Sequence, residues 1–257
     1  MYINMMYQIF SFILSALILY FIVKKLNFKA YDLKIANHKR SAIISLIVVL
    51  VTVIIMAPLV LIFLKFFVID WLDFNKINNS SMWEIINVIV ALLQITPLII
   101  ITLLRKESFY SLGITKSNVF KSVLIGFISY IIYFSFMVIM KQYRFPFPSN
   151  SVFSLLALVN WFLVAFAEEV LFRGYLQTRL MEWLGNQRGL ILTALIFSFS
   201  HLFQRILSVD MSLSRALVSC IAIIPFALFM GYLFSKCKNV VATTIFHTLY
   251  NFFGNYI

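Results

Sequence analysis

Apolar runs of membrane-spanning length recur along the whole chain, and they constrain its fold more than any other feature. A transmembrane helix needs about 20 mainly apolar residues. Of the 257 residues, 63% are apolar and 12% are charged, whereas a soluble domain is about 45–50% apolar and about 25% charged. Such a chain cannot cover its surface with polar groups, so a soluble monomer is excluded, and the apolar runs exclude intrinsic disorder. The sequence predicts an all-α polytopic membrane protein.

The predicted architecture is a bundle of about eight transmembrane helices that forms a single integral membrane domain over residues 1–257. The apolar N-terminal spans occupy residues 1–150, and residues 151–257 hold the spans that carry reactive side chains. The eight spans are predicted at about 4–23, 42–64, 83–104, 119–140, 152–171, 190–207, 216–234 and 240–254.

Lysine and arginine residues are distributed unequally between the two sides of this bundle. The connections at 24–41, 105–121, 172–189 and 235–239 carry 15 of the 21 basic residues, and the remaining connections carry 6. Because basic loops stay in the cytoplasm, we expect the first set to be cytoplasmic and both termini to lie outside. The net charge of +12 then reflects membrane orientation and contact with anionic lipid headgroups. The basic residues form no single stripe, so nucleic acid is not an expected partner.

Polar residues inside the predicted spans are concentrated in the C-terminal half of the chain. Glu168, Glu169, His201, His247 and Asn251 all lie within or at the edge of these spans, whereas the N-terminal spans are almost wholly aliphatic and aromatic. A charged side chain at the bilayer centre costs about 2.5–3.5 kcal/mol, so such residues usually face one another or a polar cavity. Their conjunction predicts a functional site.

The segment AEEVLFRG, at 167–174, indicates how the first of these residues are arranged. Glu169 and Arg173 are four residues apart on one helix face and are expected to form an ion pair. Glu168 is rotated by about 100° from Glu169, so it is left out of that pair. Considered without the neighbouring motif, Arg173 would be typical of a side chain at a helix end that extends to the membrane surface and anchors the helix there.

Two further helices repeat this spacing of four residues. Phe197 and His201 share one helix face, and His247 and Asn251 share another. Glu168 is expected near the cytoplasmic end of its span, with both histidines two to three turns from the cytoplasmic ends of theirs. The three helices would therefore meet in the cytoplasmic half of the bilayer.

This set of residues suits hydrolysis, which needs an activated water, a base for its proton and donors for the oxyanion. Glu168 with His201 can supply the base and orient the water, and His247 with Asn251 can donate to the oxyanion. The signatures of other membrane proteases, HExxH, GxGD and GxSG, do not occur in the sequence.

The motifs EEVLFR (168–173), FSFSH (197–201) and HTLYN (247–251) resemble the EExxxR, FxxxH and HxxxN motifs of the CPBP family. This family comprises CAAX prenyl proteases and membrane proteins of bacteriocin processing and self-immunity. The resemblance implies an eight-helix intramembrane glutamic endopeptidase in which Glu168 activates water and His201 assists it. By the same resemblance His247 and Asn251 form the oxyanion site, while Glu169, Arg173 and Phe197 support the site structurally.

The resemblance also has implications for the cofactor, the substrate and the location of the protein. No cofactor is expected; the alternative is zinc bound by Glu168, His201 and His247. The expected substrate is a peptide or a membrane protein. Abundant Phe, Ile, Lys and Asn indicate an AT-rich bacterial genome, which favours a protein of the bacterial plasma membrane in bacteriocin self-immunity or peptide maturation. A non-proteolytic immunity or binding protein is the alternative, and a proton-coupled transporter ranks third, since no Gly- or Pro-broken helix pairs are visible.

Overall fold

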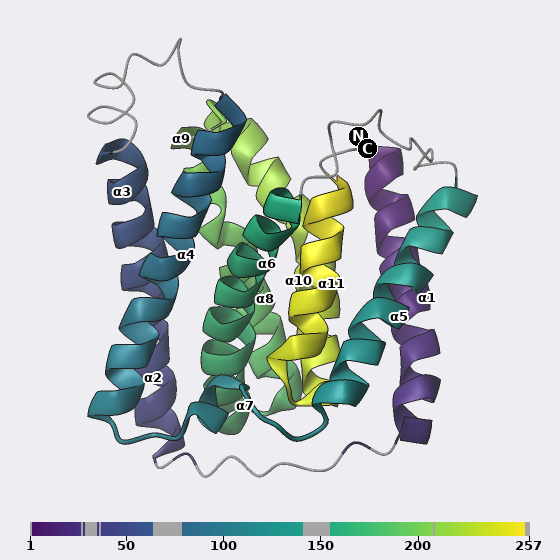
Figure 1. Ribbon diagram of the computed structural model, residues 1–257, viewed down its shortest axis with the longest axis horizontal. Coiled ribbons are helices and arrows are strands. Elements are labelled where there is room, and N and C mark those ends of the chain that lie inside the picture. Colours follow the sequence, from purple (N-terminus) through teal and green to yellow (C-terminus); the bar gives the residue numbers. More distant parts are fainter. Residues whose placement is uncertain are drawn as a thin grey trace.

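The computed structural model describes residues 2–26, 28, 35, 37–63, 79–140, 155–207 and 209–254. The regular elements of these residues are helices, which stand side by side as a bundle (Figure 1) and confirm the predicted all-α membrane fold. The elements in chain order are α1 (Tyr2–Leu26), α2 (His38–Leu50), η1 (Val51–Met56), α3 (Ala57–Phe63), α4 (Asn79–Leu104), η4 (Phe109–Leu112), α5 (Val119–Ile139), α6 (Leu155–Glu169), η5 (Val170–Gln177), α7 (Thr178–Leu184), α8 (Asn186–Ser200), α9 (Leu202–Leu207), α10 (Leu213–Cys237) and α11 (Val240–Gly254).

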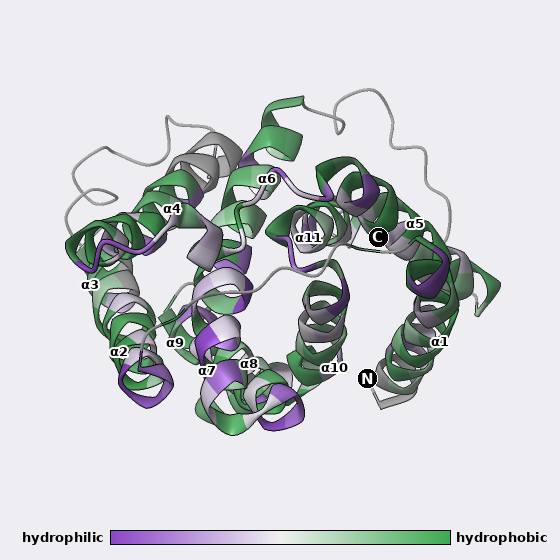
Figure 2. Ribbon diagram, turned by 90° about the horizontal axis from the view of Figure 1, so that it is seen from below, coloured by the Kyte–Doolittle hydropathy of each residue, from purple (hydrophilic) through white to green (hydrophobic). Residues whose placement is uncertain are grey.

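Seven helical stretches among the described residues are long and apolar enough to cross a membrane. They run over Met6–Leu26, His38–Val60, Ile86–Leu104, Val119–Ile139, Leu155–Leu184, Asn186–Leu207 and Leu213–Cys237. The eighth predicted span coincides with α11, whose 15 residues make it shorter than the others. Seen along the bundle, α11 stands between α5 and α6 (Figure 2), so it lies inside the helical layer. Of the predicted connections, 141–151 and most of 65–82 lie outside the described residues.

The prediction that the fifth span ends at residue 171 is wrong. The helix continues from α6 through the π-helix η5 and α7 as far as Leu184, so most of the predicted connection at 172–189 is helical. Its polar residues are buried because other elements pair with them; for example, Gln177 Nε2 donates to Gly231 O at 2.9 Å. Leu176, Leu180 and Leu184 recur every four residues, which is the apolar pattern of a continuing helix.

The outer faces of the bundle are apolar and its lower end is polar in the orientation of Figure 1. Large apolar side chains such as Leu104 and Phe120 are about three-quarters exposed, at 74% and 75%. Hydrophilic residues gather along α7 and at the lower ends of neighbouring helices, while the outer helices are mostly hydrophobic (Figure 2). This distribution is the one expected of a protein whose flanks face lipid.

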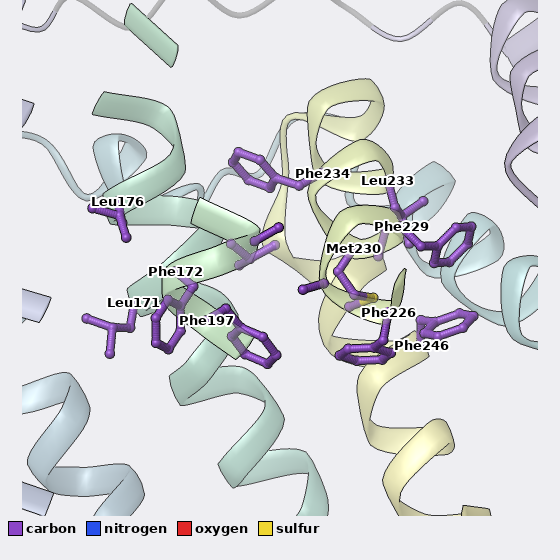
Figure 3. Close-up of a cluster of buried hydrophobic side chains, with 14 of the residues drawn as sticks. Leu171, Phe172, Leu176, Phe197, Phe226, Phe229, Met230, Leu233, Phe234 and Phe246 are labelled. Atoms are coloured by element: carbon purple, nitrogen blue, oxygen red, sulfur yellow. The ribbon is translucent and has the colours of Figure 1, made fainter. Parts of the chain in front are cut away.

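Aromatic side chains of α8, α10 and α11 form the part of the core that carries the candidate site (Figure 3). The ring of Phe226 lies 6.1 Å from that of Phe197 and 6.3 Å from that of Phe246, measured between centroids. These tilted arrangements are typical of packed aromatic pairs. Through α10, the cluster therefore joins α8, which ends directly before His201, to α11, which carries His247 and Asn251.

Candidate active site

Glu168 and Glu169 close α6, and the π-helix η5 begins at the next residue. All eight residues of η5 are buried. π-helical turns are rare and occur frequently at functional sites, because they widen the helix locally. Since the helix runs on for roughly 22 Å of rise from Glu169 to Leu184, the prediction that Glu168 lies near the end of its helix is wrong. The glutamate pair lies in mid-helix.

The predicted ion pair between Glu169 and Arg173 is confirmed. Arg173 Nε lies 3.5 Å from Glu169 Oε2, and both side chains are 0% exposed. Arg173 also donates from Nη2 to Ala227 O at 3.5 Å, and its guanidinium carbon lies 4.4 Å from the centre of the Phe197 ring. Arg173 is therefore enclosed by the bundle and does not anchor a helix end at the membrane surface.

His247 of α11 lies between the two glutamates. Its Nδ1 is 2.9 Å from Glu169 Oε1, and its Nε2 is 3.7 Å from Glu168 Oε2. Glu169 faces Arg173 as a carboxylate and accepts hydrogen bonds, so Nδ1 carries the hydrogen of this contact. The contact fixes the ring so that Nε2 faces Glu168, whose side chain at 15% exposed is the more accessible of the two glutamates.

His201 lies directly after α8, which ends at Ser200, and α9 begins at the next residue. The helix is thus interrupted within the predicted span at 190–207. The backbone carbonyl of Phe197 lies 2.9 Å from His201 Nδ1. Because a carbonyl only accepts, Nδ1 carries the hydrogen, and Nε2 of the neutral ring is left as an acceptor.

The ring of Phe197 connects the two histidines. Its centroid lies 4.9 Å from that of His201 and 6.1 Å from that of His247. Within the described part of the chain, no hydrogen bond or ion pair joins His201 to Glu168, although the charge of Glu168 acts on His201. Asn251 follows His247 by four residues on α11 and is half-buried. Six of the seven predicted site residues are therefore linked by direct contacts, and α11 holds the seventh, Asn251, one turn away.

The zinc alternative finds no support in this arrangement. Among the described residues, no group of three or more His, Cys, Asp or Glu side chains is placed to hold a metal ion. In the part of the chain that the structure describes, no hydrogen bond or ion pair joins His201 to the pair of Glu168 and His247. The residues as they lie do not fit a three-ligand zinc site, so no step below is routed through a metal. Independence from cofactors stays a prediction.

A second buried polar cluster was not predicted. Arg179 of α7 forms an ion pair with Glu107, donates from Nη1 to Ser111 O at 3.1 Å, and stacks on the Tyr175 ring at 3.8 Å. Glu107 also accepts from Arg105 Nε at 2.6 Å. Burial raises the pKa of Glu107, but the two guanidinium groups outweigh it, so this pKa lies below its usual range. The apolar repeat through Leu184 was the signal that could have placed Arg179 inside the bundle.

Comparison with known proteins gave a family match. Residues 150–253 match the family model described as Rce1-like, type II CAAX prenyl endopeptidase. The matched range contains all the residues of the three motifs, from Glu168 to Asn251. No curated protein and no solved structure gave a significant match. Over residues 150–253 the chain is therefore similar to type II CAAX prenyl endopeptidases of the Rce1-like family, which supports the resemblance of its motifs to those of the CPBP family.

Proposed function

We propose that the chain is an intramembrane endopeptidase that hydrolyses a peptide bond with a water activated by Glu168. The observation that carries this proposal is the row of contacts from Arg173 through Glu169 to His247, which ends with Nε2 facing Glu168 at 3.7 Å. A structural ion pair would be complete with Arg173 and Glu169 alone. The second carboxylate and the oriented ring are what a hydrolytic site requires.

In the proposed reaction Glu168 takes a proton from water, and the water oxygen attacks the carbonyl carbon of the peptide bond. The carbonyl electrons move to oxygen and form the oxyanion. When the carbon–nitrogen bond breaks, Glu168 gives the proton to the leaving amine, so the carboxylate is restored. The free Nε2 lone pair of neutral His201 can accept a hydrogen bond from the water and orient it.

His247 and Asn251 are the proposed donors to the oxyanion. Donors held in place before the reaction stabilise the developing charge most effectively, and the bond from His247 to Glu169 holds the ring in this way. Because Nδ1–H is already donated to Glu169, Nε2 can donate to the oxyanion only while the ring carries both protons. The mechanism thus requires ionised Glu168 and doubly protonated His247 at the same time.

We further propose that the protein acts in a bacterial plasma membrane, on a peptide or membrane-protein substrate, in bacteriocin self-immunity or peptide maturation. The apolar flanks and the family match support the membrane setting. The immunity role rests on the resemblance to the wider family. A non-proteolytic binding protein is the alternative outcome of the experiments below.

The decisive experiment uses the purified protein in lipid nanodiscs with a quenched fluorescent peptide that is farnesylated and ends in a CAAX sequence. Glu168→Gln should lower kcat about 10²–10⁴-fold, because it removes the general base, while the amount of folded protein stays unchanged. Glu182→Gln is the matched control, since this carboxyl on α7 is 41% exposed and lies outside the site. Equal cleavage by wild type and Glu168→Gln would overturn the assignment. Binding of the peptide without cleavage by the wild type would favour the binding alternative.

A cell-protection assay tests whether immunity requires the chemistry. His201→Ala, His247→Ala and Asn251→Ala should each lose protection at normal expression. Asn251→Ala should be the mildest, since the loss of one oxyanion donor costs about 10²–10³ in rate and leaves some turnover. Full protection by all three variants would separate immunity from this site.

The orientation in the membrane can be tested with introduced cysteines, because both native cysteines are buried. Gln187, at the exposed lower end of the bundle, and Val209, at 48% exposed near α9, offer accessible positions. The excess of basic residues predicts that an impermeant thiol reagent added to intact cells labels Val209→Cys and leaves Gln187→Cys unlabelled. The opposite labelling would place the site in the outer half of the bilayer.

A further inference from the structure

The connection at 105–118 joins α4 to α5 and lies outside the family match at 150–253. It nevertheless contacts both elements that flank the candidate site. Ser111 in this connection accepts from Arg179 at its backbone oxygen, 3.1 Å, and at its hydroxyl, 3.2 Å. Glu107 pairs with the same arginine, which is completely buried. The connection is thereby tied to the helix that carries the glutamate pair.

Two glycines allow the connection to approach this helix closely. A Cβ atom on Gly174 of η5 would overlap the backbone oxygen of Leu112, so the two backbones are in direct contact. Gly113 has φ +69°, and a Cβ atom there would lie 2.8 Å from Val240 and 3.0 Å from Phe234. The positive φ and the crowding both favour glycine at this position.

The same connection holds the first turn of α11. Val240 N donates to Gly113 O at 3.0 Å. The completely buried Asn239 donates from Nδ2 to Thr115 O at 2.9 Å and to Ser117 O at 3.1 Å. Its Oδ1 accepts from Val241 N at 2.9 Å and caps the helix. These contacts lie about two turns before His247, or roughly 10 Å along the helix.

We infer that the connection at 105–118 sets the position of His247 relative to Glu168, and that Asn239 and Gly113 act through it as positioning residues. One side of the connection is fixed to the helix of the two glutamates and the other to the start of α11, so it acts as a spacer between them. This inference rests on the proposed function only where it concerns activity. A misplacement of about 1 Å in a catalytic constellation can cost about 10²-fold in rate.

Asn239→Ser tests the spacer, because serine keeps an N-cap oxygen but cannot bond to the two carbonyls of the connection. Gly254→Ala is the matched control on α11, since nothing lies within 4 Å of a Cβ atom there. Two readouts are taken on the full-length protein in nanodiscs. One is kcat and KM for the farnesylated CAAX peptide, and the other is the ¹⁵N spectrum of the three histidines, with His247 assigned by His247→Gln.

We expect Asn239→Ser to lower kcat about 10-fold or more, to leave KM within twofold and to shift the His247 Nδ1 signal. The His201 signals and the control should be unchanged. An unchanged His247 signal overturns the inference even if kcat falls. In that case the substitution lowers the rate without changing the environment of His247. If the wild type does not cleave the peptide, the proposed function is contradicted, but the inference about the spacer is not. A shifted His247 signal would still support the spacer in that case.

Discussion

Buried polar side chains are satisfied in different ways in the N-terminal helices and in the helices of the candidate site. In α2, η1 and α5 several buried hydroxyl groups bond within their own helix, although Ser41 of α2 also accepts from Arg105. Ser45 donates to Ala42 O, and Thr52 donates to Val48 O, both at 2.7 Å. Such local bonds satisfy the hydroxyl wherever the helix lies. They therefore place no constraint on how these helices pack against one another.

The helices of the candidate site bond across the bundle instead. The side chain of Gln177 reaches Gly231, 54 residues away in sequence, and Asn239 reaches Thr115, 124 residues away. These bonds can form only in one arrangement of the helices, because each leaves a buried group unpaired if a helix shifts. The comparison indicates that hydrogen bonds across the bundle fix the register of the helices that carry the glutamates and His247, whereas the local hydroxyl bonds of the N-terminal helices do not fix theirs.

The largest effect on stability is expected from Arg173→Met. The substitution keeps most of the side-chain volume but removes the arginine partner of the completely buried Glu169 carboxylate, which then keeps its contact with His247. The loss of one partner of a buried ion pair costs about 3–5 kcal/mol. Unfolding in mixed micelles, followed by circular dichroism, measures this loss.

Lys121→Met in α5 is the matched control from the N-terminal half. Lys121 Nζ donates to Leu26 O at 2.7 Å from a half-buried position. Its loss should cost no more than about 1.5–3 kcal/mol, as for a charged hydrogen bond, and less where water reaches the group. Equal destabilisation by the two methionine variants would remove the distinction between the regions.

Gly174→Ala should have the next largest effect on stability. It should destabilise the protein, whereas the replacement of glycine by alanine in a helix usually stabilises it. Alanine normally stabilises a helix relative to glycine by about 0.5–1 kcal/mol. Here the new methyl group would overlap the backbone oxygen of Leu112, and overpacking costs about 1–3 kcal/mol, occasionally more. Gly254→Ala, with open space around its Cβ position, should be neutral or stabilising. Stabilisation by both alanine variants would contradict the close contact between the connection and η5.

The sequence predicted the fold and one contact of the candidate site because both follow from short-range patterns. Span-length apolar runs gave the bundle, and the spacing of four residues gave the ion pair of Glu169 with Arg173. The end of the fifth span was misplaced because Arg173, Gln177 and Arg179 are polar enough to suggest a loop. Their partners, among them Ala227 and Gly231, lie in a distant helix, and no local pattern reveals such pairing.

The bond of His247 to Glu169 was not predicted for the same reason. Helical geometry correctly separated Glu168 from the ion pair, but the side on which α11 packs decides which glutamate the histidine touches. The π-helix that follows Glu169 also escaped prediction. It depends on tertiary packing rather than on a recognisable local sequence.

Gln177→Leu should destabilise the protein by about 0.5–1.5 kcal/mol, since it removes a buried hydrogen bond that joins η5 to α10. Ser129→Ala is its counterpart in α5, where the hydroxyl bonds to Ile125 O within the same helix. This variant should change the free energy of unfolding by less than about 1 kcal/mol, because the carbonyl keeps its helical environment. A larger loss from Ser129→Ala than from Gln177→Leu would reverse the comparison.

The smallest expected effect is a change in acid sensitivity on replacing Glu107. Burial raises the pKa of this carboxyl, but Arg179 and Arg105 lower it further, so its net pKa lies below the usual range. A carboxyl whose pKa is lowered by folding contributes stability above its unfolded pKa of about 4.3 and loses that contribution as pH falls through the folded value. Glu107→Gln should therefore lower the thermal midpoint at pH 7. The difference in thermal midpoint between this variant and the wild type should become smaller as the medium is acidified towards pH 3.

Glu107→Asp should retain part of the wild-type acid dependence, because it keeps a carboxylate beside the two arginines. A gap between Glu107→Gln and wild type that stays constant with pH would show that this carboxyl contributes by packing and not by its charge.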